Sequence, residues 1–364
     1  MSWRTSILGA VDVTGSRPEL KLGFLSFGHW QRARWSRTPT AKEALVQSIE
    51  LAEAAEEIGI DGAFVRVHHF ARQLASPFPL LAAIGARTSR IEIGTGVIDM
   101  RYENPLYMAE EAAAADLIAG QRLQLGISRG SPEPALDGPE AFGYQNAQGE
   151  ARGELARAHT ELFRRAIAGG AVARADPAQT GMGGMLAIEP RSDTLGERIW
   201  WGSGTRESAL WVAAQGMNLM SSTLLLEDTG VAFDELQAQQ IEGYREAWAA
   251  AGWEREPRVS VSRSVIPIVS DEDRTYFGRD GNGDQLGYLD GRMSRFGRTY
   301  TGEPDRIAEQ LAQDRAIAAA DTVLLTVPNQ LGVEYNAKLL DTIAKHVAPA
   351  LGWRAKGGAG SAID

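Results

Sequence analysis

The sequence predicts one (β/α)8 barrel with insertions, a fold of the α/β class. Short apolar segments alternate with longer segments of helical periodicity, which indicates strands and helices in turn and therefore a parallel sheet. Eight such pairs follow one another within roughly 330 residues, the length expected of this barrel. No linker divides the chain, so we expect residues 21–352 to form a single domain between an N-terminal extension, 1–20, and a flexible tail, 353–364.

The expected strands are apolar segments bounded by turn residues, and apolar and polar side chains alternate along several of them. They are residues 21–27, 62–69, 91–98, 122–128, 199–201, 217–221, 259–269 and 322–327.

The expected helices carry apolar side chains three or four residues apart. The first has Thr40 as a candidate N-cap and Gly59 as a C-terminal stop, and the third begins at Pro105, a residue favoured in the first helical turn. In order, the helices are expected at 41–58, 77–88, 105–118, 154–168, 205–215, 233–251, 304–314 and 333–351.

Three segments interrupt this alternation. Residues 132–149 contain three prolines and are expected to form a long loop. Residues 169–197 are rich in glycine and are predicted to be an insertion with a short strand at 185–188. Residues 270–301 are polar and glycine-rich, and they show no clear period.

Composition excludes several classes of function. Lys and Arg total 37 against 47 Asp and Glu, a formal charge of −10, and without a basic block nucleic acid is not an expected partner. The absence of cysteine excludes disulfides, thiolate metal sites and a cysteine nucleophile. No apolar run is long enough to span a membrane, and the N-terminus lacks the apolar core of a secretion signal. We therefore expect a cytoplasmic protein that does not bind membranes.

In barrels of this kind the functional site lies where the strands end at their carboxyl termini. The residues expected at those ends are His29, His68, His69, Gly96, Asp99, Ser128, Arg129, Ser203, Thr205, Ser221 and Asn329.

The end of the fourth expected strand allows two chemical interpretations. Arg129, followed at once by Gly130, suits capture of an anion by a guanidinium and exposed backbone N–H groups. Gly126, Ser128 and Gly130 also match the Gly-x-Ser-x-Gly pattern of a hydrolase nucleophile elbow, which requires a helix directly after the serine. The prolines and glycines that follow argue against that helix. A loop closed by Ser128 and Arg129, without any catalytic role, is a more probable alternative than a nucleophilic serine.

The end of the fifth expected strand also suits an anion. Small residues before the helix at 205–215 would let an anion approach its N–H groups, and Thr205 and Ser208 add hydroxyls. An ordinary N-cap by Ser203 or Thr205 explains the same residues. A third glycine after Gly202 and Gly204 is missing, so the dinucleotide fingerprint is absent. Combined with Arg129 from a neighbouring strand, a phosphate site is the better interpretation.

The two histidines after the second expected strand should face opposite ways, because neighbouring strand residues alternate. We expect His68 to face the site as a general base and His69 to face the outer wall. No carboxylate lies beside them to complete a metal triad, so no metal is expected. Residues 280–284 imitate the start of a calcium loop, but Gln285 and Gly291 occupy the positions that require glycine and glutamate.

An ordered set of motifs resembles the bacterial luciferase family, whose members are flavin-dependent monooxygenases and deazaflavin-dependent relatives on (β/α)8 barrels. The resemblance extends over about residues 21–351. The motifs are Val67-His68-His69-Phe70, Ile93-Gly94-Thr95-Gly96, Asn104-Pro105, Ala109-Glu110-Glu111, Leu125-Gly126-Ile127-Ser128-Arg129-Gly130, Phe142-Gly143, Ala213-Ala214-Gln215-Gly216 and Tyr300-Thr301-Gly302-Glu303-Pro304.

The resemblance implies roles for individual residues. His68 matches the catalytic histidine that assists oxygen chemistry, Gly96-Val97 a cis peptide against the flavin ring, and residues 270–301 a mobile lid. Ser128 stands where luciferases carry a reactive but dispensable cysteine. The cofactor-binding residues that it implies are Gly96, Val97, Ser128, Arg129, Ser203, Gly204, Thr205 and Ser208, with Arg152 as a possible second cation.

The sequence also departs from the family. Val67 replaces an acidic residue that usually precedes the two histidines. Arg66 is expected on the same face as His68, where the family tends to be apolar, and an inward charge needs a partner. We expect Asp99 to be that partner. A polar or anionic substrate is therefore possible.

The resemblance implies an FMN-dependent two-component monooxygenase. Reduced FMN would come from a separate flavin reductase and react with O2 at C4a, and the peroxyflavin would oxygenate a small organic substrate. The resemblance also implies a homodimer. Three alternatives stay open: a deazaflavin-dependent oxidoreductase, a flavin-binding protein without catalysis, and an unrelated barrel hydrolase that uses Ser128.

Overall fold

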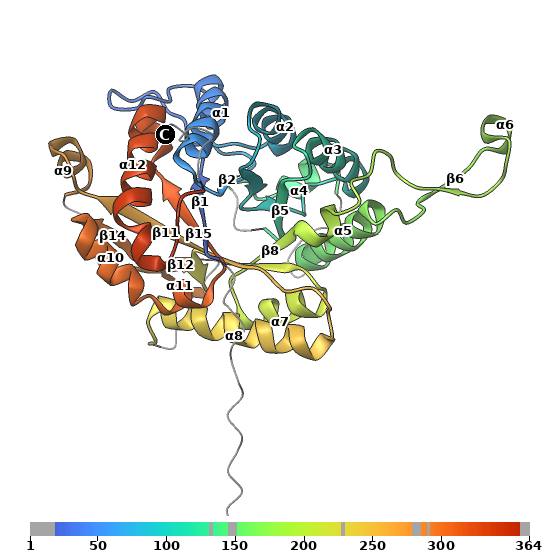
Figure 1. The fold of residues 1–364 in the computed structure, drawn as a ribbon. Coiled ribbons are helices and arrows are strands. Elements are labelled where there is room, and N and C mark those ends of the chain that lie inside the picture. The colour runs from blue at the N-terminus through green and yellow to red at the C-terminus, as the bar shows by residue number, and fades with distance from the viewer. Residues whose placement is uncertain are drawn as a thin grey trace, which may run out of the picture.

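The computed structural model describes residues 19–130, 134–144, 151–226, 230–278, 285–289 and 292–356. Most of the expected N-terminal extension and of the expected tail lies outside these ranges, as does the calcium-like segment 280–284. In Figure 1 helices surround a ring of strands.

The described strands close into a parallel eight-stranded barrel, which confirms the predicted fold. β9 pairs with β11, and this pairing closes the ring. Around the ring the strands are β1 (Lys21–Ser26), β2 (Gly62–Val65), β3 (Glu92–Thr95), β5 (Leu123–Ser128), β8 (Ile199–Ser203), β9 (Asn218–Ser221), β11 (Val259–Pro267) and β15 (Thr322–Val327).

Helices follow the strands in the predicted order. α1 ends at Gly59, whose φ is 96°, and Asn104 caps α3 by accepting hydrogen bonds from the N–H groups of Leu106 and Tyr107. The long helices are α1 (Ala41–Ile58), α2 (Pro77–Arg87), α3 (Pro105–Ile118), α5 (Ala151–Ile167), α7 (Arg206–Ala214), α8 (Phe233–Ala251), α10 (Pro304–Ala312) and α12 (Gly332–His346).

Several boundaries differ from the prediction. The strand expected at 62–69 ends at Val65, because its neighbours β1 and β3 offer no pairing partner beyond that point. The strand expected at 91–98 divides at the cis peptide bond between Gly96 and Val97, and continues as β4 (Ile98–Asp99). The helix expected at 304–314 ends at Ala312 and is followed by α11 (Arg315–Ala319). The helix expected at 333–351 ends at His346, before the 3-10 turn η3 (Ala348–Leu351).

The insertion at 169–197 contains a hairpin. Its strands are β6 (Ala173–Arg174) and β7 (Met185–Leu186), with α6 (Pro177–Thr180) between them. In Figure 1 this hairpin extends away from the barrel. The loop expected at 132–149 contains the short helix α4 (Gly138–Ala141).

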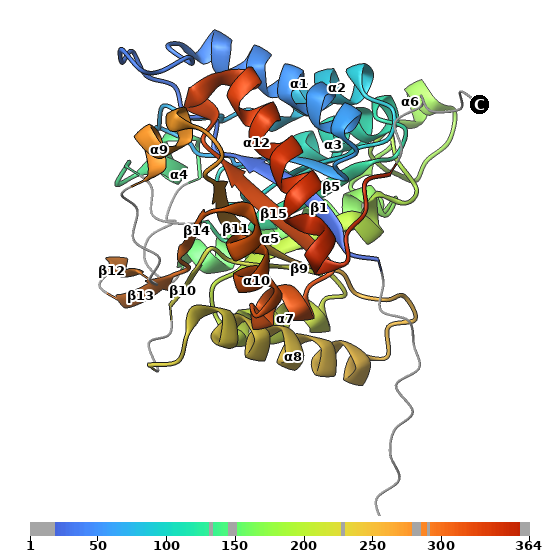
Figure 2. The same cartoon turned by 60° about the vertical axis from the view of Figure 1, so that its left-hand side comes forward.

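The segment 270–301 is more regular than its sequence indicates. It holds α9 (Asp271–Phe277) and the strands β12 (Gln285–Leu289) and β13 (Arg292–Phe296), and β14 (Thr299–Gly302) pairs with β11. β13 also pairs with β10 (Leu224–Leu225), and the three strands lie together at one side of the barrel in Figure 2. The mobile lid expected at 270–301 stays a prediction.

A partly buried charge cluster lies at the end of the barrel opposite the expected site. Glu92 accepts hydrogen bonds from Arg258 at 3.0 and 2.9 Å and also pairs with Lys21. Arg258 lies 4.9 Å from the ring centroid of Trp200. This cluster joins residues of β1, β3 and β8 with the residue before β11. It lies at the amino ends of these strands, and the cavity described below lies at their carboxyl ends.

Candidate functional site

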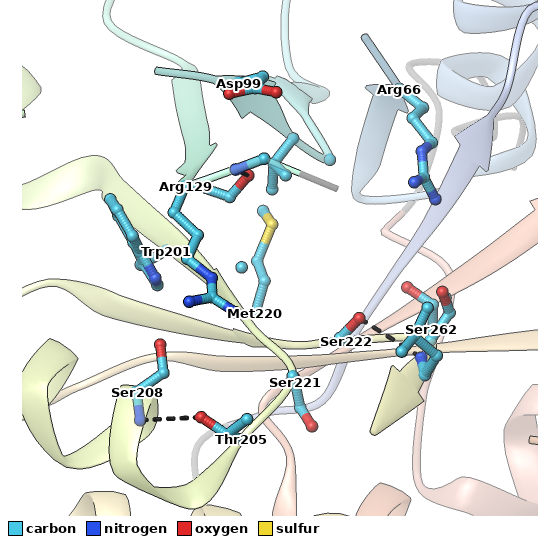
Figure 3. A pocket seen from close by; sticks show the side chains of 18 of the residues that line it. Arg66, Asp99, Arg129, Trp201, Thr205, Ser208, Met220, Ser221, Ser222 and Ser262 are labelled. Carbon is cyan, nitrogen blue, oxygen red and sulfur yellow. Dashed lines mark hydrogen bonds between the residues drawn. The ribbon is translucent and has the colours of Figure 1, made fainter. Parts of the chain in front are cut away.

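A cavity of about 300 Å³ opens at the carboxyl ends of the barrel strands. Its apolar floor consists of Leu25, Met220 and Leu324. The expected site residues that line it are His68, Gly96, Val97, Ser128, Arg129, Gly204, Thr205 and Ser208. In Figure 3, Arg129 and Arg66 approach the cavity from opposite sides.

A buried ion pair fixes the strand end that carries Arg129. Arg101 donates from Nε to Asp99 Oδ1 at 2.9 Å and to Oδ2 at 3.0 Å, and its backbone N–H donates to Oδ1. Asp99 pairs in β4 with Ser128 of β5, and the N–H of Met100 donates to the Ser128 carbonyl at 3.0 Å. Arg101 therefore donates to both carboxylate oxygens of Asp99. The expected pairing of Asp99 with Arg66 stays a prediction.

The turn after β5 places Arg129 over the cavity. Gly130 has a φ of 87°, and its N–H donates to Ser128 Oγ at 3.0 Å. A Cβ at Gly130 would lie 2.1 Å from Asp99 Oδ2, so the turn packs directly on the ion pair. The first helix described after Ser128 begins only at Gly138. The nucleophile elbow, which needs a helix directly after its serine, does not form here.

The N-terminal end of α7 forms the wall beside Arg129. Thr205 is the N-cap, and its Oγ1 accepts a hydrogen bond from the N–H of Ser208 at 3.1 Å. Ser203 does not line the cavity: its buried hydroxyl donates to the Thr205 carbonyl at 2.9 Å. The ordinary N-cap interpretation thus holds for Thr205, while Thr205, Ser208 and Gly204 still lie on the cavity wall.

Two further residues at this end have no counterpart in the sequence analysis. Trp201 is 2% exposed, and its Nε1–H has no hydrogen-bond acceptor among the described residues. Its ring packs edge-on against Trp211 at 4.8 Å, and Arg157 of α5 lies 5.1 Å from the Trp211 ring centroid. Both Trp201 and Arg157 line the cavity. The side chain of Arg152, the expected second cation, lies outside the described residues.

A buried N–H donor without an acceptor is costly, and it marks a position where a ligand can supply the acceptor. Trp201 Nε1, the guanidinium of Arg129 and the hydroxyls of Thr205 and Ser208 are the donors that a phosphate monoester requires. The cavity wall at Gly202 packs closely on Val97, because a Cβ at Gly202 would lie 3.3 Å from both methyl groups of Val97. These residues fit a phosphate monoester.

Arg66 and His68 lie at the opposite end of the cavity. Arg66 lies 5.0 Å from the ring centroid of Phe27, on which His29 stacks at 5.8 Å. Partial burial, with the positive potential of His68 and Arg66, lowers the pKa of His29 below its ordinary value of 6.5. His68 and Arg66 line the cavity, whereas His69 packs against Tyr102 at 4.4 Å and Phe142 at 5.0 Å.

His68 thus lines the cavity and His69 does not, although both lie beyond the end of β2. The N–H of His68 donates to the Leu74 carbonyl at 2.9 Å, a loop contact and not a strand ladder. Because these residues are not in a strand, strand alternation does not explain their separation, and the outer-wall position of His69 stays a prediction.

Other candidate sites are limited in the part of the chain that the structure describes. It contains no group of three or more His, Cys, Asp or Glu side chains that could hold a metal ion. None of its helices is both long and apolar enough to cross a membrane.

Comparison with known proteins relates this chain to a protein family. A family model described as luciferase-like monooxygenase matches residues 25–276. The 4-hydroxyprotoasukamycin monooxygenase of Streptomyces nodosus subsp. asukaensis is 36% identical over 90 residues, 24% of each chain. The oxygenase component of the flavin-dependent trigonelline monooxygenase of Acinetobacter baylyi is 32% identical over 110 residues, 30% of each chain.

A third relative is named for a different cofactor. The F420-dependent glucose-6-phosphate dehydrogenase of Nocardia farcinica is 33% identical over 124 residues, 32% of this chain and 36% of that protein. The three alignments therefore span only about a quarter to a third of each curated relative.

Two solved structures share the fold over nearly the whole barrel. The monooxygenase RslO1 of Streptomyces bottropensis superposes with a TM-score of 0.68 at 22% identity, covering 91% of this chain and 99% of that one. The oxygenating constituent of the 3,6-diketocamphane monooxygenase of Pseudomonas putida, solved with FMN, gives 0.64 at 16%, with 91% and 98% covered.

The packing of Gly130 on the Asp99–Arg101 pair generates a first prediction. Gly130→Ala adds a methyl group that meets the ion pair and forces alanine into a left-handed conformation, which alone costs about 1–2 kcal/mol. Gly252→Ala is the matched control, since Gly252 has a φ of 74° but nothing within 4 Å of its Cβ position. We expect Gly130→Ala to lower the free energy of unfolding by more than Gly252→Ala in chemical denaturation. Equal losses would show that the pair does not support the turn.

Proposed function

The chain belongs to the luciferase-like monooxygenase family, and from this premise we propose that it is the FMN-dependent oxygenase of a two-component system. A separate flavin reductase would supply reduced FMN. The enzyme would use this reduced FMN and O2 to oxygenate a small organic substrate. The observation that carries the proposal is the convergence of Arg129, Arg157, Trp201 Nε1 and the start of α7 at one end of the cavity.

The residues at the Arg129 end of the cavity indicate that the ligand carries a phosphate. Charge-assisted hydrogen bonds to a phosphate are about twice as strong as neutral ones, and the N-terminal end of a helix favours an anion further. Arg129, Thr205 and Ser208 supply this environment from β5 and α7, and Arg157 adds a cation from α5. These side chains come from β5, α5 and α7, which are far apart in the sequence. Their meeting at one end of the cavity supports a bound phosphate there.

Other residues of the cavity would hold the ring end of the same ligand. Gly96 and Val97 line one side of the cavity, and Leu25, Met220 and Leu324 form the apolar floor. When bound, the reduced flavin supplies the two electrons that activate O2. The chain's own residues orient the ring and exclude water, and His68 can hold or deliver a proton at its imidazole.

A deazaflavin is the second candidate cofactor, because a relative named for F420 also matches this chain. Glu207 in the first turn of α7 also lines the cavity. Its carboxylate repels the FMN phosphate as well as the anionic oligoglutamate tail of a deazaflavin, so it does not separate the two cofactors.

The sequence also indicates the source of the electrons in the proposed reaction. It lacks the third glycine of a dinucleotide fingerprint after Gly202 and Gly204, which favours a separate reductase as the source of electrons. One relative is likewise named as an oxygenase component. A homodimer and a cytoplasmic location complete the proposal on the basis of the family resemblance.

The phosphate assignment predicts a selective loss of affinity. Arg129→Ala should weaken FMN by about ten- to a hundredfold, the equivalent of roughly 1.5–3 kcal/mol, while riboflavin, which has no phosphate, loses little. Arg174→Ala, on the projecting hairpin, is the control and should leave both affinities unchanged. Fluorescence titration of the two flavins measures the effect. An equal loss for FMN and riboflavin would contradict the assignment.

The placement of the histidines predicts different defects for two neighbouring substitutions. His68→Ala should retain most of the FMN affinity and lower turnover by about 10²-fold or more, the scale of a positioned acid–base group. His69→Ala should instead cost stability on the order of 1 kcal/mol, because it removes a ring packed against Tyr102 and Phe142.

The measurement is turnover of both variants with reduced FMN in excess, together with their unfolding curves. An inactive His69→Ala beside a nearly normal His68→Ala would reverse the two assignments.

A further inference from the structure

The face of β11 that points to the barrel axis carries serines. Side chains alternate along a strand, and one set of alternate positions in β11 packs in the main hydrophobic core: Val259, Val261 and Val265. Ser260, Ser262 and Ser264 occupy the other set and therefore face the axis. The interior of such a barrel is usually filled by layers of Val, Ile and Leu. Three hydroxyls in place of these side chains indicate a function at this strand.

Two of the three serines lie beside the apolar floor of the cavity. Ser260 is in register with Met220 of β9, and Ser262 is in register with Leu324 of β15. Both serines line the cavity, and Ser260 is only 2% exposed. In Figure 3, Ser262 lies on the side of Met220 that is away from Arg129. A ligand that extends from Arg129 across the floor therefore meets these two hydroxyls at its far end.

The three serines differ in their hydrogen bonds. Ser264 Oγ pairs with Thr326 Oγ1 at 2.5 Å, and neither residue belongs to the described lining of the cavity. Among the residues that the structure describes, none forms a hydrogen bond with the hydroxyl of Ser260 or of Ser262. A hydroxyl removed from water without a hydrogen-bond partner is costly. The Ser260 and Ser262 hydroxyls are thus available to a ligand, whereas that of Ser264 is satisfied within the barrel.

The chemistry of the flavin ring system matches this pair of hydroxyls at one edge only. The pyrimidine edge carries the C2=O and C4=O acceptors with the N3–H donor between them, and the opposite edge carries two methyl groups. A serine hydroxyl can donate and accept, so it can pair with any group of the pyrimidine edge. Residues two apart on a strand have Cα atoms about 6.6 Å apart, so Ser260 and Ser262 can contact different groups of one planar edge.

We propose that Ser260 and Ser262 form hydrogen bonds with the pyrimidine edge of the flavin ring. The inference rests on the proposed function, because it assigns the Arg129 end of the cavity to the phosphate of the same ligand. It adds two cofactor-binding residues on β11, and it states which edge of the ring faces that strand.

The test combines a modified ligand with a modified protein. N3-methyl-FMN differs from FMN only by the methyl group that replaces the N3–H. We expect the wild type to bind N3-methyl-FMN at least about tenfold more weakly than FMN, because a buried hydroxyl then loses its partner. The double variant Ser260→Ala/Ser262→Ala should bind FMN more weakly by about two- to tenfold per hydroxyl and discriminate between the two ligands by less than about threefold.

Ser264→Ala is the matched control, because it removes a serine from the same face of the same strand whose hydroxyl is bonded to Thr326. Its affinity for FMN should stay within about twofold of the wild type, with the discrimination intact. Infrared spectra of the bound flavin give a second readout. The C2=O and C4=O stretching bands should move to higher frequency in the double variant, where hydrogen bonds are lost, and should not move in Ser264→Ala.

The possible failures are distinguishable. A wild-type protein that binds neither FMN nor riboflavin would overturn the proposed function itself. A protein that binds FMN but accepts N3-methyl-FMN equally well, or whose double variant keeps the full discrimination, would overturn only the assignment of Ser260 and Ser262. Riboflavin has the same ring without the phosphate, so the double variant should lose affinity for both flavins alike. A loss confined to FMN would place the hydroxyls at the phosphate and likewise contradict the inference.

Discussion

The cavity depends on the ion pair between Asp99 and Arg101. Both side chains are buried, and breaking such a pair by removing one partner costs roughly 3–5 kcal/mol, because a charge is left buried without compensation. Asp99 of the pair belongs to β4, which pairs with the end of β5, and Gly130 packs directly against the pair. The backbone geometry of this strand end thereby directs Arg129 over the cavity. The chain thus uses one satisfied ion pair to position a cation for an external anion.

Several positive charges converge on a cavity in an acidic protein. Arg129 and Arg157 both line it, and an anion that enters between two such cations lowers their mutual repulsion. The buried Nε1–H of Trp201 has no acceptor among the described residues, and a ligand could supply one.

Local chemistry explains which parts of the fold the sequence could predict. The bounds of α1, α3, α8 and β15 agree with those expected, because caps, prolines and apolar periodicity act within a few residues. The end of β2 was missed, since strand length is set by distant partners. The same cause concealed the order within 270–301, whose strands pair with β10 and β11.

The site was predictable to a similar extent. Arg129, Thr205 and Ser208 were recognisable because each directly follows a strand or opens a helix. Arg157 has no such signal: it lies in the interior of α5, and only the packing of that helix against the barrel brings it to the cavity. Ser203 was assigned to the phosphate because a serine before a helix suits an anion, but its hydroxyl satisfies a carbonyl of its own turn.

The central claim is that this cavity holds reduced FMN through its phosphate. The most direct test is the anaerobic affinity of the purified protein for reduced FMN, measured beside reduced riboflavin and a reduced deazaflavin with its oligoglutamate tail. The account predicts that reduced FMN binds at least about tenfold more tightly than either of the others, because it alone pairs a phosphate with Arg129 and ends there. Tighter binding of the deazaflavin, or equal binding of riboflavin and FMN, would contradict it.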